Sequence, residues 1–258
     1  TGQVILAHAW RGALARHDIS AAQILLSPED TETRRRHLNA RATIKMLIGL
    51  GAVPVVNEND TVATAEIRFG DNDRLAARVA AMISADLLVL LSDVDGLYST
   101  NPHKSESATH IAEVTKLSSD ILQMAGRANA TYASGGMVTK LEAARIAMTA
   151  GCGMIICDGR IDRPILSLIK GGRNTLFRAE DSPLTARKRW ISGALTPKGN
   201  LVVDAGAELA LRNGRSLLPA GAIAASGSFE RGDLISVENE KGHVIANGLS
   251  AYSVADTK

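Results

Sequence analysis

An uninterrupted apolar run from Leu87 to Leu91 constrains the fold of this chain more than any other feature of its sequence. Strands that are apolar on both faces are typical of buried parallel sheets, whereas half-exposed strands alternate. Two similar runs occur at 53–56 and 153–157, and segments with helical spacing at 72–85 and 136–151 precede the runs at 87–91 and 153–157. This alternation predicts an α/β fold, a three-layer sandwich around a mainly parallel sheet.

The rest of the first part of the chain fits this architecture. Apolar spacing predicts a helix over 2–17 and a strand over 22–26. Pro28 and the two acidic residues after it favour the start of a helix that continues to Gly51. The same criteria predict, in chain order, a surface loop at 99–110, a helix near 117–126, a flexible stretch around 127–137, a short helix from about 163 and an edge strand at 175–177.

The texture of the sequence changes after Pro183, where long helical patterns give way to short alternating segments and glycine turns. Short β segments are predicted in LVVD, SLLPAGA, SGSFERGDLISVEN and GHVIANGLS. The change places a domain boundary near 180–187. We therefore expect an α/β domain over 1–182 and a small β-rich module over 187–258.

Composition restricts the classes of function. The chain has 258 residues and a net charge of only +2, so no strong basic field attracts nucleic acid. No apolar run approaches the about 20 residues that span a bilayer, and no secretory signal is present, which predicts a cytoplasmic protein. Cys152 and Cys157 share one apolar stretch and are interpreted as buried structural thiols. The six histidines are scattered without metal-ligand spacing, and no metal site is predicted.

Two segments rich in Asn and Asp, 57–60 and 70–73, follow an apolar strand and a polar hairpin. Asn offers both donors and acceptors, and Asp offers charged acceptors. Together they suit a small ligand that carries an amino group and a carboxylate. The alternative is that these residues only form turns. Because both segments lie within about a dozen residues of each other, a shared binding site is favoured.

A second candidate is Ser92-Asp93, directly after the apolar run at 87–91. Small polar side chains at the carboxyl end of a strand can meet a nucleotide or a phosphate. The alternative interpretation is a helix cap or a tight turn containing Asp95-Gly96. The residues alone favour neither.

A third candidate is the loop from Ser134 to Lys140, which runs into an alanine-rich helix. Paired glycines let backbone N–H groups approach an anion, and the amino end of a helix carries partial positive charge. Lys140 falls in the first turn, where it can reach a phosphate. The spacing differs from a Walker A loop, and the alternative for Lys140 is a solvated surface lysine. The candidate phosphate-binding residues are Ser134, Gly135, Gly136, Met137, Val138, Thr139 and Lys140.

These three elements, in this order, resemble the amino acid kinase family. The resemblance rests on VPVVNENDTVATAEIRFGDND, LLVLLSDVDGLYSTNP, SGGMVTKLEAARIA and ARKRWISGAL. It extends over almost the whole chain and is strongest for the branch of the family that phosphorylates the γ-carboxylate of L-glutamate, at the start of proline synthesis. The β-rich part resembles a PUA domain, a small pseudo-barrel.

The resemblance implies roles for the candidate residues. Asp60 and Asn72 would hold the amino acid substrate, with Asn57 and Asp71 nearby. Ser92 and Asp93 would contact ATP, and the loop 134–140 would bind its phosphates. Lys140 would be catalytic, countering charge on the group in transfer, and Mg²⁺ would be carried by the nucleotide. Inhibition by proline and a homo-oligomeric state are also implied.

The family pattern also implies that segments are missing from this chain. A strand with a lysine and a glycine turn opens the family's kinase domain, and neither is found in this chain. The PUA-like part stops early, at Lys258. We therefore expect both domains to be incomplete here, and this chain alone to lack part of its active site.

Two alternatives remain open at this point. One keeps the fold but changes the acceptor, to another amino acid, an acetylated amino acid or a nucleoside monophosphate. The other is an RNA-binding or regulatory protein that uses the PUA-like module, with the basic cluster at 187–189 beside Trp190. The low net charge disfavours RNA binding.

Overall fold

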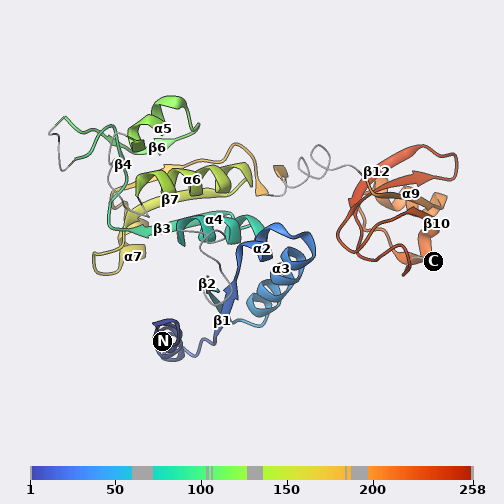
Figure 1. The fold of residues 1–258 in the computed structure, drawn as a ribbon, viewed down its shortest axis with the longest axis horizontal. Helices are drawn as coiled ribbons and strands as arrows, with labels where there is room; N and C mark the ends of the chain where they lie inside the picture. Colours follow the sequence, from blue (N-terminus) through green and yellow to red (C-terminus); the bar gives the residue numbers. More distant parts are fainter. Residues whose placement is uncertain are drawn as a thin grey trace. The chain divides into compact units, whose positions relative to one another are not determined.

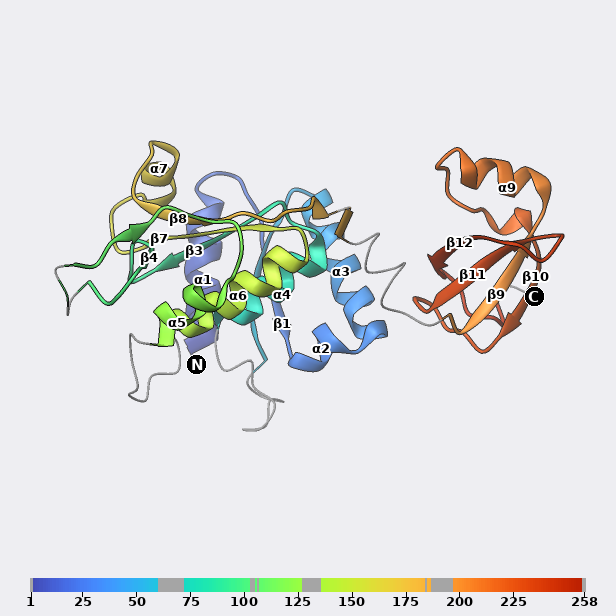
Figure 2. The same ribbon diagram turned by 90° about the horizontal axis from the view of Figure 1, so that it is seen from above.

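The computed structural model of the chain describes residues 2–59, 72–102, 105, 107–126, 136–183, 185–186 and 197–256. The chain forms two compact units, Thr1–Ala186 and Arg187–Lys258 (Figures 1 and 2). In the described part, no helix has both the length and the apolar character needed to cross a bilayer.

The main sheet of the first unit has the strand order β3-β7-β8-β6. Strands β3 (Leu87–Ser92) and β7 (Gly153–Asp158) are parallel and paired along their whole length. Strand β8 (Asn174–Phe177) runs antiparallel to β7, and β6 (Glu113–Val114) is parallel to β8. The prediction that 175–177 forms an edge strand was wrong, because the two-residue strand β6 covers its other side.

A second parallel pair joins β1 (Ala21–Leu26) to β2 (Val53–Glu58) through helix α3 (Arg34–Gly49). Helix α1 (Gly2–Ala15) precedes β1. These elements agree with the predicted order of helix, strand, helix and strand. With parallel pairing between β1 and β2, between β3 and β7 and between β6 and β8, the predicted mainly parallel α/β fold is confirmed.

The single helix expected from Pro28 to Gly51 is instead two helices. Helix α2 (Pro28–Glu32) ends at Thr33, whose extended backbone (φ −76°, ψ 118°) also precedes α3. The first helix is held at its start by Asp30, which accepts hydrogen bonds from the Ser27 N–H and hydroxyl, both at 2.7 Å. A β-branched residue readily adopts this conformation, so the break at Thr33 has a local cause.

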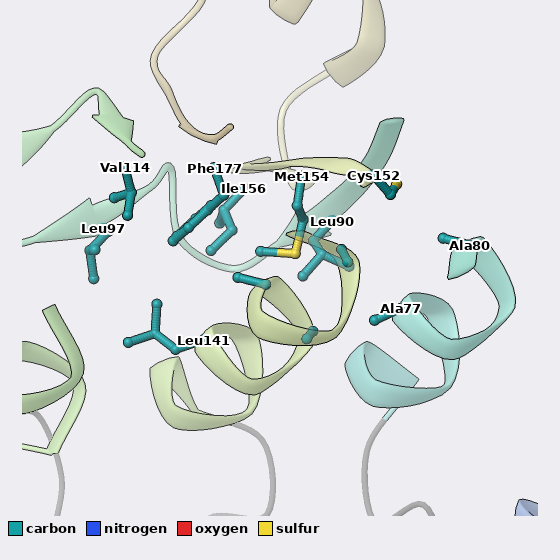
Figure 3. Close-up of a cluster of buried hydrophobic side chains, with 13 residues drawn as sticks. Ala77, Ala80, Leu90, Leu97, Val114, Leu141, Cys152, Met154, Ile156 and Phe177 are labelled. Carbon is teal, nitrogen blue, oxygen red and sulfur yellow. The ribbon is translucent and has the colours of Figure 1, made fainter. Parts of the chain in front are cut away.

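Helices α4 (Asn72–Ile83) and α6 (Met137–Thr149) supply the helical side of the core. Figure 3 shows Met154, Ile156 and Phe177 of the strands lying over α6, near Leu141. Each of these large side chains is at most 1% exposed, and burial of such a side chain is worth about 1.5–3 kcal/mol. Small fully buried residues let the two helices and the sheet approach closely: Ala77, Ala143, Ala144 and Ala147.

Shorter elements complete the first unit. Helix α5 (Ser119–Gly126) packs on α6, and helix α7 (Pro164–Ile169) follows β7. Strands β4 (Leu97–Tyr98) and β5 (His110–Ile111) form a small antiparallel pair at the two ends of the segment expected to be a surface loop. Both helices lie where the sequence pattern predicts them.

Both cysteines are buried and free, as predicted. Burial raises the pKa of the Cys152 thiol to about 11, with a smaller contribution from Asp86. Burial also raises the pKa of Cys157. The thiolate is the reactive form, so at neutral pH these side chains act as small buried apolar groups.

The second unit is a four-stranded sheet with the order β10-β9-β11-β12. Its core contains Leu201, Val203, Phe229, Ile235 and Val237. The strands are β9 (Gly199–Val203), β10 (Ala222–Gly227), β11 (Leu234–Asn239) and β12 (Val244–Leu249). The prediction that this part of the chain is rich in β-strands is confirmed.

One local prediction for this unit was wrong, and one helix was not predicted. The run SLLPAGA is not a strand, because Pro219 opens a short 3-10 helix, η1 (Pro219–Gly221), and only Ala222 joins β10. An additional helix, α9 (Ala205–Arg212), follows β9. It is capped by the Asp204 carboxylate, which accepts from the Ala207 N–H at 2.7 Å.

Candidate active site

Short connections bring the amino ends of α4 and α6 to the carboxyl edge of strands β3 and β7. Only residues 84–86 separate α4 from β3, and only 150–152 separate α6 from β7. Each helix therefore runs back along its strand. Helix α6 has 13 residues and β7 has 6, so each is about 20 Å long. The helix starts consequently lie where the two strands end.

A buried ion pair joins the starts of the two helices. The Nζ atom of Lys140 lies 3.1 Å from Oδ2 of Asp73, and the two side chains are only 11% and 18% exposed. The Thr139 hydroxyl can donate to the same carboxylate oxygen at 3.2 Å or to the Gly136 carbonyl at 2.8 Å. The ammonium group is therefore held in one place, unlike that of a solvated surface lysine.

The same place carries positive potential from the backbone. Gly136 precedes α6 with extended backbone (φ −124°, ψ −167°), and its carbonyl accepts from the N–H groups of Thr139 and Lys140 at 3.2 and 3.4 Å. Helix α4 starts beside it. Two helix amino ends and a lysine ammonium meet here, with the Asp73 carboxylate offsetting part of the positive charge, and this arrangement can receive an anion such as a phosphate.

A second, more exposed ion pair joins the same two helices. Arg74 of α4 forms a salt bridge with Glu142 of α6, one turn or less from the Lys140–Asp73 pair. Two ion pairs and the packing of α4 against α6 thus connect the same two helices. The position of Lys140 relative to Asp73 therefore depends on helix packing as well as on the two side chains.

Ser92 and Asp93 lie at the carboxyl end of β3, as predicted. The Ser92 hydroxyl donates to Oδ1 of Asp93 at 3.0 Å. In the sheet, Ser92 is the register partner of Asp158, the last residue of β7. Asp158 accepts two side-chain hydrogen bonds from Arg160, each at 2.9 Å, which lower the pKa of its carboxyl group to about 2. A fixed ion pair thus stands beside Ser92 and Asp93.

The close approach of β7 to β3 at this edge requires a glycine. The Gly159 N–H donates to the Ser92 carbonyl at 2.7 Å. A side chain at this position would place its Cβ 2.9 Å from Cβ of Leu91, closer than real Cβ atoms come. Gly159 therefore fixes the direction in which the chain leaves Ser92.

Two of the four residues predicted to bind the amino acid lie in the described part. Asn57 is near the end of β2, where its Oδ1 accepts from the Glu58 N–H at 2.9 Å, and Asn72 is the exposed first residue of α4. Strand β2 and α4 share a small core that contains Leu26, Leu75 and Val56. Asp60 and Asp71 lie outside the described residues.

The predicted phosphate loop is described in part. Gly136, Thr139 and Lys140 meet at the start of α6, whereas Ser134 and Gly135 lie outside the described residues. Met137 packs against the main core, and Val138 is 48% exposed. The side chain of Met137 therefore has a packing role.

Asp73 lies in the segment 70–73 that is predicted to bind a small ligand, but its contact with Lys140, which crosses 67 positions of the chain, was not predicted. Asp158 was missed for a similar reason, since nothing in the sequence pairs the end of one strand with that of another. An acidic residue at the start of a helix was the available signal.

No group of three or more acidic, histidine or cysteine side chains suited to a metal ion occurs among the residues that the structure describes.

Comparison with known families agrees with this geometry. Residues 1–158 match the model of the amino acid kinase family, and residues 199–258 match that of the PUA domain. The chain belongs to the amino acid kinase family. The two matched regions lie in the first and the second compact unit respectively.

Its curated relatives narrow the assignment. The chain is 57% identical over its whole length to glutamate 5-kinase of Paramagnetospirillum magneticum, covering 70% of that protein. It is 54% identical to glutamate 5-kinase 1 of Rhizobium meliloti and 55% identical to glutamate 5-kinase of Nitrobacter hamburgensis, covering 65% and 68% of their lengths. Within the family, the chain therefore groups with the glutamate 5-kinases, of which it spans about two thirds.

Proposed function

We propose that this chain is the part of a glutamate 5-kinase that carries its phosphoryl-transfer site and its PUA-like module. The reaction transfers the γ-phosphoryl group of ATP to the γ-carboxylate of L-glutamate, giving L-glutamyl 5-phosphate, the first step of proline biosynthesis. The observation that carries the proposal is identity above 50% to glutamate 5-kinases along the whole chain.

The described geometry supports the phosphoryl-transfer half of this proposal. One glutamate carboxylate oxygen forms a bond to the γ-phosphorus while the bond from that phosphorus to the bridging oxygen of ADP breaks. The group in transfer is anionic throughout, so catalysis depends on positioning and charge neutralisation. Lys140 and the starts of α4 and α6 supply positive charge at one place. ATP binds there through Ser134, Gly135, Gly136, Met137, Val138, Thr139 and Lys140.

In this proposal Asp73 is a positioning residue and not a reactant. Its carboxylate holds the Lys140 ammonium at 3.1 Å, which keeps the charge fixed before the nucleotide binds. Ser92 and Asp93 contact ATP from the end of β3. The magnesium ion enters on the nucleotide phosphates, where it neutralises part of their charge.

The amino acid is bound by Asp60 and Asn72, with Asn57 and Asp71 beside them. Carboxylates suit the ammonium group of glutamate, and amides suit its carboxylates. The position of Asn72 at the start of α4, next to Asp73, supports the placement of glutamate near the phosphoryl group.

Further parts of the proposal concern the protein as a whole. The kinase domain occupies 1–182 and the PUA-like domain 187–258, and the enzyme acts in the cytoplasm as a homo-oligomer that proline inhibits at or near the glutamate site. Exposed apolar residues on α1, among them Val4, Ile5 and Trp10 at 71%, 70% and 48%, support self-association. The PUA-like domain is not assigned RNA binding.

The assay that tests this function measures ADP release by the complete protein with MgATP and L-glutamate. L-aspartate, N-acetyl-L-glutamate and UMP serve as alternative acceptors. We expect that, of these acceptors, only L-glutamate supports turnover with MgATP. We also expect hydroxylamine to trap the acyl phosphate product as a hydroxamate. Absence of glutamate-dependent ADP release would contradict the proposal, and a preference for another acceptor would move the chain to a different branch of the fold.

A substitution at Asp60 tests the substrate assignment. Asp60→Ala is expected to raise the KM for glutamate more than the KM for ATP, because it removes a charged acceptor for the ammonium group of the amino acid. Steady-state kinetics with each substrate varied in turn give both constants. Equal effects on the two KM values would argue against a role of Asp60 in binding glutamate.

A further inference from the structure

Thr175 is a fully buried polar residue at the centre of the first unit. It lies in β8, is 0% exposed, and is the register partner of Ile156 on β7. Its hydroxyl donates to the Ile111 carbonyl at 2.6 Å and accepts from the Leu97 N–H at 2.8 Å. One hydroxyl group thus joins β8 to strands β5 and β4, across 64 and 78 positions of the chain.

These two contacts meet the β4–β5 pair at a single point. Leu97 and Ile111 are register partners in that pair, so the hydroxyl satisfies one backbone group from each of its strands. Both backbone groups are removed from water, and in the protein interior an unpaired N–H or carbonyl group is unfavourable. Thr175 therefore fixes the position of the hairpin on the main sheet.

Gly96, just before β4, tightens the same junction. Its φ is +154°, and a Cβ there would lie 2.6 Å from both the Thr175 hydroxyl and Nε2 of His110. Both contacts are shorter than real Cβ atoms make. The chain passes so close to Thr175 that a change at this hydroxyl would be transmitted directly to the preceding residues.

The preceding residues run from Ser92 to Gly96 and include Asp93. At one end the Ser92 carbonyl is held by the Gly159 N–H at 2.7 Å. At the other end the Leu97 N–H is held by Thr175. Only four residues, 93–96, lie between these two anchors, so their course depends on both.

We infer that Thr175 is a positioning residue for the nucleotide: without touching ATP, its hydroxyl holds the 92–97 segment in the conformation that binds MgATP. This inference rests on the proposed function, which assigns Ser92 and Asp93 to ATP. Among the described glutamate candidates, Asn57 lies in β2 and Asn72 in α4, so we expect the effect to fall on the nucleotide.

The test compares Thr175→Val, which keeps the shape but loses both hydrogen bonds, with Thr175→Ser, which keeps the hydroxyl. Thr115→Val, at an exposed threonine, is the matched control. Calorimetric titration gives the Kd for MgATP, and steady-state kinetics give kcat and both KM values. For Thr175→Val we expect the Kd and KM for MgATP to rise about tenfold, the scale of lost buried hydrogen bonds, with the KM for glutamate unchanged. Thr175→Ser and Thr115→Val should match the wild type.

Unchanged MgATP affinity in Thr175→Val, a parallel rise in both KM values, or failure of Thr175→Ser to restore affinity would each overturn the inference. Circular dichroism establishes which variants are folded. If Thr175→Val is unfolded, the same comparison is made between Thr175→Ala and Thr175→Ser. Measurements on the wild type distinguish failure of the proposed function from failure of the inference about Thr175. If the wild type shows no glutamate-dependent turnover, the proposed function is contradicted. If the variants without the hydroxyl bind MgATP normally, only the role of Thr175 is contradicted.

Discussion

Replacement of Lys140 by alanine is expected to lower kcat/KM for glutamate phosphorylation by about 100-fold, the scale of losing one charge-stabilising group. The ammonium group lies at the start of α6, held by Asp73 at 3.1 Å and almost fully shielded from water. A charge in such surroundings acts more strongly on a neighbouring anion than a solvated one. The starts of α4 and α6 remain in the variant, so some activity should persist.

Steady-state kinetics with saturating MgATP and varied glutamate, and the reverse, measure this effect. Lys241→Ala is the control, because Lys241 is an exposed lysine of the second unit, in the turn between β11 and β12. It should leave every kinetic constant unchanged. An unchanged kcat/KM in Lys140→Ala would remove Lys140 from the mechanism and return it to the class of structural lysines.

Lys140 could be proposed as a site residue from the sequence because the pattern that indicates it is local. Two glycines, a helix start and a lysine in the first turn occur within the seven residues 134–140. Ser92 and Asp93 were accessible for a similar reason, since they end an apolar run. Patterns of this kind depend on the chain within one turn or one strand, where spacing determines direction.

The long-range contacts in and around the site could not be predicted from the sequence. The contact of Asp73 with Lys140 depends on how α4 packs against α6, and that of Thr175 with Leu97 on where β8 lies in the sheet. No local pattern contains this information. The edge assignment of 175–177 failed for the same reason, since β6 is only two residues long and has no periodicity to detect.

Local chemistry accounts for the remaining errors. The break at Thr33 and the 3-10 turn at Pro219 are each caused by a single residue in a run that is otherwise helical or apolar. Helix α9 begins after Asp204, whose carboxylate caps it; this local signal is present in the sequence but was not recognised. Element order was therefore predictable, whereas ends and breaks were not.

Asp73→Asn is expected to lower kcat/KM by about 100-fold as well, although Asp73 touches no substrate in the proposed mechanism. Its carboxylate holds the Lys140 ammonium through a charge-assisted hydrogen bond, whereas a neutral amide offers only a weaker, uncharged acceptor. The same change leaves a buried ammonium group without a charged partner, which should cost about 3 kcal/mol of unfolding free energy. Kinetics are therefore measured below the thermal transition of the variant, and stability by chemical denaturation.

Glu208→Gln is the matched control for this substitution. Glu208 is also an acidic residue in the first turn of a helix, α9 of the second unit, and it pairs at 2.7 Å with Arg212, whose side chain is 67% exposed. Exposed pairs of this kind contribute little to stability. This variant should retain the kinetic constants of the wild type and lose far less stability than Asp73→Asn.

The double variant Asp73→Asn/Lys140→Ala decides how Asp73 acts. If Asp73 works only by holding Lys140, its loss cannot matter once Lys140 is absent, so the double variant should be no slower than Lys140→Ala. Removing the ammonium should also recover part of the stability lost in Asp73→Asn, because no unpaired charge then remains buried. Multiplicative losses in kcat/KM would contradict this reading: they would mean that Asp73 contributes to transfer independently of Lys140, through the nucleotide or the glutamate itself.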